Sequence, residues 1–140
     1  MISLDNKQKE KDLKKQISSL CVGDLICVEW CDASVGKSSS SGTMIDVPVK
    51  SWGVYMGLFG NNTKHVVVAQ NSFRYADGVF DLDYTAIPLS FAVGVSVLAK
   101  EHIPKEAAGK LVNSFLMGGH RAFNHTRTFQ QRLSVHGGPD

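Results

Sequence analysis

The sequence predicts a mainly β domain of the α+β class, in which five short strands form a barrel and a helix flanks them at each end. Five segments rich in β-branched and aromatic residues follow one another without a helical pattern between them. This order favours an antiparallel sheet or closed barrel over a parallel α/β design. Apolar residues at helical spacing come before and after the region. The strands are expected at residues 25–30, 51–59, 64–70, 79–84 and 91–98.

The first three expected strands carry the clearest local signals. The first one alternates, with Ile26, Val28 and Trp30 on one face and Glu29 on the other. The second and third strands flank a turn at residues 60–63, so we expect them to form a hairpin. Two glycines inside the second strand are expected to permit bulges or strong bending.

The fourth expected strand follows a loop predicted at residues 71–78, and it carries two acids, Asp81 and Asp83, on one face. Paired carboxylates of this kind suit a divalent cation or acid–base chemistry. Solvated acids on an edge strand explain the same alternation and discourage edge-to-edge pairing, and we favour this second interpretation. Nearby aromatic residues either line a ligand groove or cap the barrel ends, and capping is slightly favoured for Phe73, Tyr75 and Tyr84.

Apolar spacing predicts the two helices. Leu13, Ile17 and Leu20 recur at i, i+4 and i+7 on an otherwise charged segment. The second helix is expected to begin near Pro104 and to stop at the glycines that start at Gly118. The expected organisation is a single barrel domain with its flanking helices at residues 1–118 and a basic, aromatic-containing tail at 119–140.

Composition indicates a globular chain. Of its 140 residues, 43% are hydrophobic and 20% are charged. Its three cysteines cannot all pair with one another, and the N-terminal segment lacks the apolar region of a secretory signal, so we expect free thiols in a reducing cytoplasm. No apolar run approaches the roughly 20 residues that cross a bilayer, so no membrane association is expected.

Charge is unevenly distributed along the chain. Residues 1–21 hold five lysines and three acids, whereas residues 22–106 hold six basic and nine acidic side chains. Residues 107–140 hold four basic side chains and one acid. Basic ends around an acidic middle suggest a polyanionic partner that is contacted through the termini.

Two patterns suggest a cofactor or metal site, and each has a simpler explanation. Residues 36–38 read Gly-Lys-Ser, but a phosphate-binding loop needs an earlier glycine where Cys31 stands, and no helix pattern follows. Cys27 and Cys31 share one face of the first strand but lie about 13 Å apart, too far to bind one tetrahedral ion. We therefore expect no cofactor, no metal and no catalytic residue.

The strand region resembles the small SH3-like or Sm-like β-barrels found in archaeal and viral proteins. The segments that carry the resemblance are GDLICVEWCDA at residues 23–33, the hairpin SWGVYMG…KHVVVAQ, and TAIPLSFAVGVSVL at residues 85–98. The order of one helix followed by five strands is also similar to the order of elements in Sm-type barrels. The resemblance implies binding of RNA, DNA or peptides, which is an analogy at the level of the fold.

A second resemblance is to the permuted papain-like hydrolases of the NlpC/P60 and lecithin:retinol acyltransferase type. It rests on GDL followed by SWGVYMG, where Ser51 stands at the position of the catalytic histidine. That family's order requires a cysteine further along the chain, yet Cys31 is the last one. The unpermuted order requires Cys21, Cys27 or Cys31 at a helix N-terminus, which the strand and helix assignments do not provide.

We expect a non-enzymatic protein that binds nucleic acid, and RNA in particular, within a larger ribonucleoprotein such as a ribosome. One alternative is a protein-interaction module whose tail folds on binding, and another is the cysteine hydrolase or an inactive relative. The tail interleaves arginines that pair with phosphate and rings that stack on bases, although it could also be a solvated end or an arm docked on its own barrel. The residues assigned to nucleic-acid binding are Lys14, Lys15, Arg121, Phe123, Arg127, Phe129 and Arg132.

Overall fold

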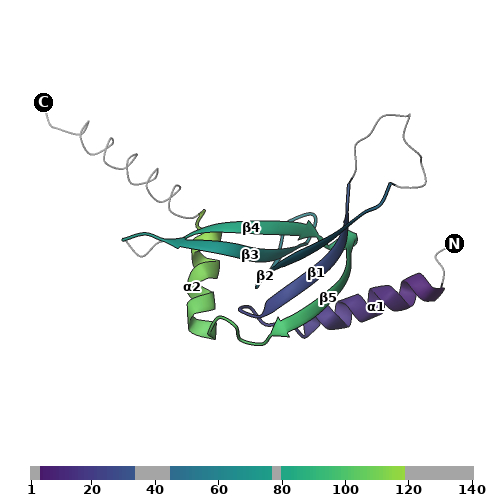
Figure 1. Ribbon diagram of the computed structural model, residues 1–140, viewed down its shortest axis with the longest axis horizontal. Coiled ribbons are helices and arrows are strands. Elements are labelled where there is room, and N and C mark those ends of the chain that lie inside the picture. The colour runs from purple at the N-terminus through teal and green to yellow at the C-terminus, as the bar shows by residue number, and fades with distance from the viewer. Residues whose placement is uncertain (1–3, 34–44, 77–79, 119–140) are drawn as a thin grey trace, which may run out of the picture.

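A computed structural model describes residues 4–33, 45–76 and 80–118. The chain forms a five-stranded sheet with a helix before it and a helix after it (Figure 1). These elements confirm the predicted α+β class, five strands and flanking helices. Their bounds are α1 Leu4–Ser18, β1 Leu25–Asp32, β2 Val47–Phe59, β3 His65–Arg74, β4 Phe80–Pro88, the 3-10 turn η1 Leu89–Phe91, β5 Ala92–Ala99 and α2 Lys105–Leu116.

The sheet is antiparallel throughout and has the strand order β4-β3-β2-β1-β5. Sequential hairpins place β1 to β4 side by side, and β5 returns to pair with β1. Among the strands described, β4 and β5 are the two edges and do not pair with each other. The sheet is therefore open, and the closed barrel that the sequence predicted is not formed by these pairings.

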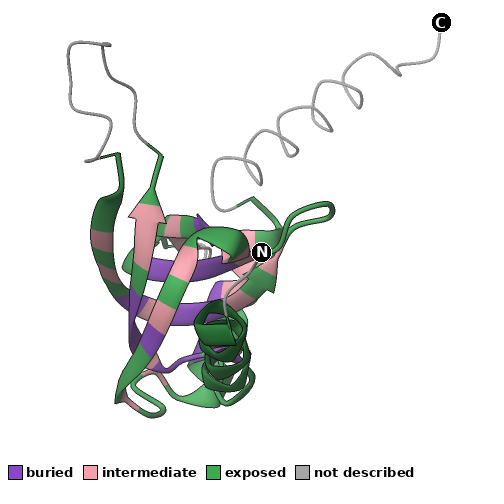
Figure 2. Cartoon of the chain, turned by 90° about the vertical axis from the view of Figure 1, so that its right-hand side faces the viewer, coloured by how far each residue is buried: buried purple, intermediate pink, exposed green. Residues whose placement is uncertain are grey.

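One face of the sheet packs against α1. The predicted alternation of β1 is confirmed, because Ile26 and Val28 are fully buried on this face with Trp30 packed beside them. Ile17 is the buried residue of α1, whose surface is otherwise largely exposed, as the green helix in Figure 2 shows. The helix also protects the edge at β5, since the side-chain carbonyl of Gln16 accepts a hydrogen bond from the backbone N–H of Val95 at 3.0 Å.

The opposite face of the sheet packs against α2. Its core consists of Met56, Val67 and Ala69 from β2 and β3, together with Leu111 from the helix. The alternation of side chains along each strand explains why one sheet supports two separate cores. The helix ends as predicted, because Gly118 adopts the left-handed conformation with φ of 80°.

Two bulges bend the middle of the sheet. The register of β2 against β3 shifts between Tyr55 and Gly57, where φ is 125°, so the bulge predicted from the glycines is confirmed. A second shift lies between Ala69 and Asn71 in β3. Beyond this bulge β3 continues to Arg74 in register with β4, so the loop predicted at residues 71–78 was wrong for residues 71–74. Pairing with β4 outweighs the weak strand preference of this polar segment.

Candidate functional site

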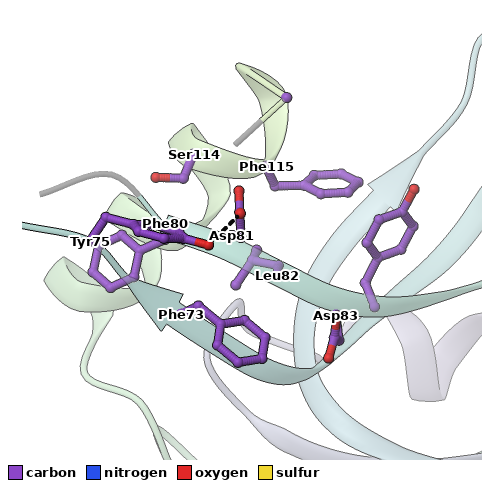
Figure 3. Close-up of a pocket in the computed structure, with 10 residues that line it drawn as sticks. Phe73, Tyr75, Phe80, Asp81, Leu82, Asp83, Ser114 and Phe115 are labelled. Carbon is purple, nitrogen blue, oxygen red and sulfur yellow. Dashed lines mark hydrogen bonds between the residues drawn. The ribbon is translucent and has the colours of Figure 1, made fainter. Parts of the chain in front are cut away.

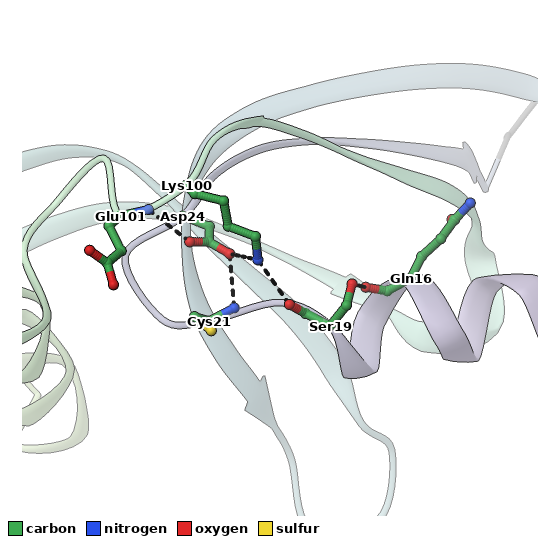
Figure 4. A network of polar contacts seen from close by, with 6 residues as sticks. All are labelled: Gln16, Ser19, Cys21, Asp24, Lys100 and Glu101. Atoms are coloured by element: carbon green, nitrogen blue, oxygen red, sulfur yellow. Dashed lines mark hydrogen bonds and ion pairs between the residues drawn. The ribbon is translucent and has the colours of Figure 1, made fainter.

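The pair Gly23 and Asp24, which directly precedes β1, has a structural role. Asp24 is completely buried, and its carboxylate accepts hydrogen bonds from the backbone N–H groups of Cys21 at 2.9 Å and Glu101 at 3.0 Å. The ammonium of Lys100 donates to the same carboxylate at 2.9 Å and to the carbonyl of Ser19 at 2.9 Å (Figure 4). The carboxylate thus joins the end of α1, the start of β1 and the end of β5.

The charge of this carboxylate is stabilised where it lies. Burial alone would raise the pKa of Asp24, but the hydrogen bonds from Lys100, Cys21 and Glu101 and the positive charge of Lys100 lower that pKa below its ordinary value. The pKa of Lys100 is raised by its hydrogen bond to Asp24. Both pKa shifts favour the charged forms of Asp24 and Lys100, so their ion pair stabilises the fold. Each of the two side chains already has its hydrogen-bond partners within the fold.

The hydroxyl of Ser51, at the position that is histidine in the papain-like resemblance, also serves the fold. Ser51 accepts a hydrogen bond from the indole N–H of Trp30 at 3.0 Å across the β1–β2 pair. The first turn of α2, where a nucleophile would benefit from the helix dipole, contains Lys105, Glu106 and alanines. Neither Ser51 nor the first turn of α2 therefore supplies the histidine or the thiol that a cysteine hydrolase needs.

The three cysteines are free thiols: Cys21 is exposed, Cys27 is buried and Cys31 is partly buried. Cys27 lies opposite Trp52 in the β1–β2 register and packs within the sheet as a small apolar residue. No three histidine, cysteine, aspartate or glutamate side chains within residues 4–33, 45–76 and 80–118 are grouped so that they could hold a metal ion.

The exposed surface of α1 is basic. Two of its lysines form ion pairs within the helix, Lys9 with Asp5 at 3.2 Å and Lys14 with Glu10 at 3.1 Å. The other three lysines lie at i, i+4 and i+8, about 6 Å apart along the helix axis. They are exposed and form no ion pair within the part of the chain that the structure describes; they are Lys7, Lys11 and Lys15.

A groove of about 920 Å³ lies beside this helix. Lys9, Lys14 and Lys64 line it, Glu10 is the one acid among its described lining residues, and its apolar lining includes Leu13. Of the two lysines predicted to bind nucleic acid, the structure places Lys14 at the groove and Lys15 on the outer surface of α1. The tail residues assigned to the same site, Arg121, Phe123, Arg127, Phe129 and Arg132, lie outside the described residues.

A second hollow, of about 500 Å³, runs along β4 between the end of β3 and the end of α2 (Figure 3). Three aromatic side chains in it are unusually exposed, Phe73 at 51%, Tyr75 at 40% and Tyr84 at 51%. They line this hollow, which supports the groove interpretation over capping of barrel ends. Asp81 and Asp83 also line the hollow, whereas no lysine, arginine or histidine is among its described lining residues.

Hydrogen bonds and ring contacts hold the hollow in shape. The phenol of Tyr75 donates to Asp81 at 3.1 Å, and the amide of Asn71 donates to Asp83 at 3.2 Å. The ring of Tyr84 meets Phe115 of α2 edge-on, with 4.9 Å between centroids. The sequence could indicate the two acids as one face of a strand, but the contribution of α2 depends on long-range packing.

The comparisons with known proteins give no match: no family model, no curated protein and no solved structure is similar to this chain. In the described part of the chain, no helix is long and apolar enough to cross a membrane.

Proposed function

We propose that this chain is a non-enzymatic nucleic-acid-binding protein of the SH3-like or Sm-like type, which contacts RNA phosphates through α1. The observation that carries the proposal is the row formed by Lys7, Lys11 and Lys15, which are exposed and unpaired with acids in the described chain. Ammonium groups spaced along one side of a helix neutralise successive phosphates and release their counterions.

Further observations support the same partner. The groove beside α1 carries three lysines and one glutamate, so its rim is also basic. The order of a helix followed by five antiparallel strands supports the barrel-type resemblance. Arginines of the tail would extend the contact, because a planar guanidinium pairs with phosphate through two hydrogen bonds.

The test measures binding of a fluorescein-labelled 20-nucleotide oligouridylate by fluorescence anisotropy between 50 and 200 mM KCl. For the wild-type chain we expect a steep loss of affinity with salt. Replacing Lys7, Lys11 and Lys15 by Gln should reduce the slope of log K against log salt by about 2, since each phosphate contact to a single strand contributes about 0.7.

The matched control changes three lysines elsewhere, Lys50, Lys105 and Lys110, to Gln. It alters the net charge equally but leaves α1 intact, so the slope should stay within about 0.5 of the wild-type value if the contacts are local. Wild-type binding that does not depend on salt would overturn the proposal. An equal loss of slope in the control would overturn the assignment to α1.

The tail is tested separately in the full-length chain. Replacing Arg121, Arg127 and Arg132 by Gln should lower affinity further and reduce the slope again, because these side chains would contact additional phosphates. Unchanged binding would exclude the tail from the interface and leave the assignment to α1 intact.

A further inference from the structure

The hollow along β4 lies at an edge of the sheet. In the described strands β4 pairs with β3 on one side only, so its outer backbone groups are not used by another strand of the sheet. An edge strand of this kind is a template for an added strand from another chain. The edge at β5 differs, because α1 packs on it and Gln16 occupies the N–H of Val95.

The two faces of β4 have different chemistry. Asp81 and Asp83 are two residues apart and lie opposite Phe73 and Asn71 of β3, so both carboxylates are on one face. Their spacing along the strand is about 6.7 Å, the same as that of alternate side chains in any paired strand.

The other face of β4 is apolar. Phe80 and Leu82 pack with the core beneath α2, and Tyr84 contacts Phe115 of that helix. This face already accepts a cation over a ring: the guanidinium of Arg74 lies 5.9 Å from the centroid of Phe80. A strand added to β4 would therefore meet acids on one side and aromatic rings on the other.

We infer that β4 and its hollow bind an extended segment of a partner protein in which basic and apolar side chains alternate. The backbone of the segment would pair with the outer edge of β4. Its basic side chains would meet Asp81 and Asp83, with their stems against the exposed ring of Phe73, and its apolar side chains would lie against Tyr84. Charge complementarity favours this occupant, since the lining has two carboxylates and no cation among its described residues.

The test measures binding of the fluorescein-labelled peptide SRVRVRS to the full-length chain by anisotropy at 100 mM salt. We expect saturable binding, and a weakening of several-fold and at most about thirtyfold when Asp81 and Asp83 are both changed to Asn, because each accessible ion pair contributes up to about a factor of five in affinity. The isosteric amides keep the shape of the strand. The matched control, Asp32→Asn with Asp46→Asn, removes two exposed charges elsewhere and should bind like the wild type.

Two further peptides separate strand addition from simple charge attraction. The isomer SRRRVVS has the same composition but lacks the alternation, so it should bind at least several-fold more weakly, and the acidic peptide SEVEVES should not bind. Equal affinity for the two basic isomers, an equal loss in the control variant, or no binding of SRVRVRS would each overturn the inference. The Asp81 and Asp83 variant should keep the affinity for oligouridylate, so failure here and failure of the RNA proposal are distinguishable.

Discussion

Replacing Asp24 by Asn tests the claim that the Gly-Asp pair organises the fold. The carboxylate is 0% exposed and accepts bonds from two backbone N–H groups and from Lys100. An amide of the same shape offers one oxygen and an NH₂ group that cannot accept, so at least one of these donors loses its partner. A buried hydrogen bond to a charged group contributes about 1.5–3 kcal/mol, and Lys100 is half-exposed, so its share is discounted. The expected loss in free energy of unfolding is about 3 kcal/mol.

The assay is urea denaturation followed by the fluorescence of the two tryptophans. With a slope of about 2 kcal/mol/M, the midpoint should fall by about 1.5 M without a change in the slope itself. Asp46→Asn is the control, because that exposed acid forms no hydrogen bond or ion pair within the described part of the chain, and it should shift stability by less than about 0.5 kcal/mol.

The pH dependence gives an independent check of the same contact. The pKa of folded Asp24 is lower than its ordinary value of 3.8, so its ionised form stabilises the fold above that value, and this contribution is lost as the pH falls through the folded pKa. The wild type and Asp24→Asn should therefore differ fully at pH 7 and approach each other below about pH 4. A loss under 1 kcal/mol at pH 7, or a constant difference down to pH 3, would refute the assignment.

Two further predictions concern the same region and the neighbouring strand pair. Gly23→Ala should destabilise the fold by about 2 kcal/mol or more, because φ is 103° and the new Cβ would lie 2.5 Å from a backbone carbonyl oxygen of the segment before α2; a smaller shift in the urea midpoint would contradict this. Ser51→Ala should cost about 1 kcal/mol by removing the acceptor of the Trp30 indole, and thermal unfolding would show it as a fall of a few degrees in Tm; no change would mean that water replaces the hydroxyl.

The sequence was sufficient where a local pattern coincides with burial. The alternation of Ile26, Val28 and Trp30 places β1 correctly because one face of that strand meets the core beneath α1. It was insufficient beyond Ala69, where a bulge resets the alternation and a polar segment becomes a strand only by pairing with β4. Barrel closure depends on how strongly the sheet bends, which no single segment determines.

The candidate sites also divide into features that the sequence could predict and features that it could not. The acids at 81 and 83 could be assigned to one face of an edge strand because a period of two is enough for that. The hollow beside them could not be predicted, since it also needs the ring of Phe115, which a helix thirty residues further along the chain supplies. Likewise, the lysines of α1 are visible in the sequence, but which of them remain unpaired depends on helix geometry.

The two proposed surfaces lie at opposite edges of one sheet. The helix α1 packs on β5, whereas the hollow runs along β4, and β1, β2 and β3 lie between those strands. The sheet curves between these edges, because Ile87 near the end of β4 lies in one buried cluster with Ile17 of α1 and Val95 of β5. The two surfaces are therefore separated along β4: residues 80–84 line the hollow, whereas the groove beside α1 reaches Leu89 beyond the other end of that strand. If both proposals hold, a basic segment in the hollow would not occupy the lysines of α1 that are proposed to contact RNA. On these two proposals, a small domain with a basic surface on α1 and an acidic hollow along β4 would hold a nucleic acid and a basic protein segment at the same time.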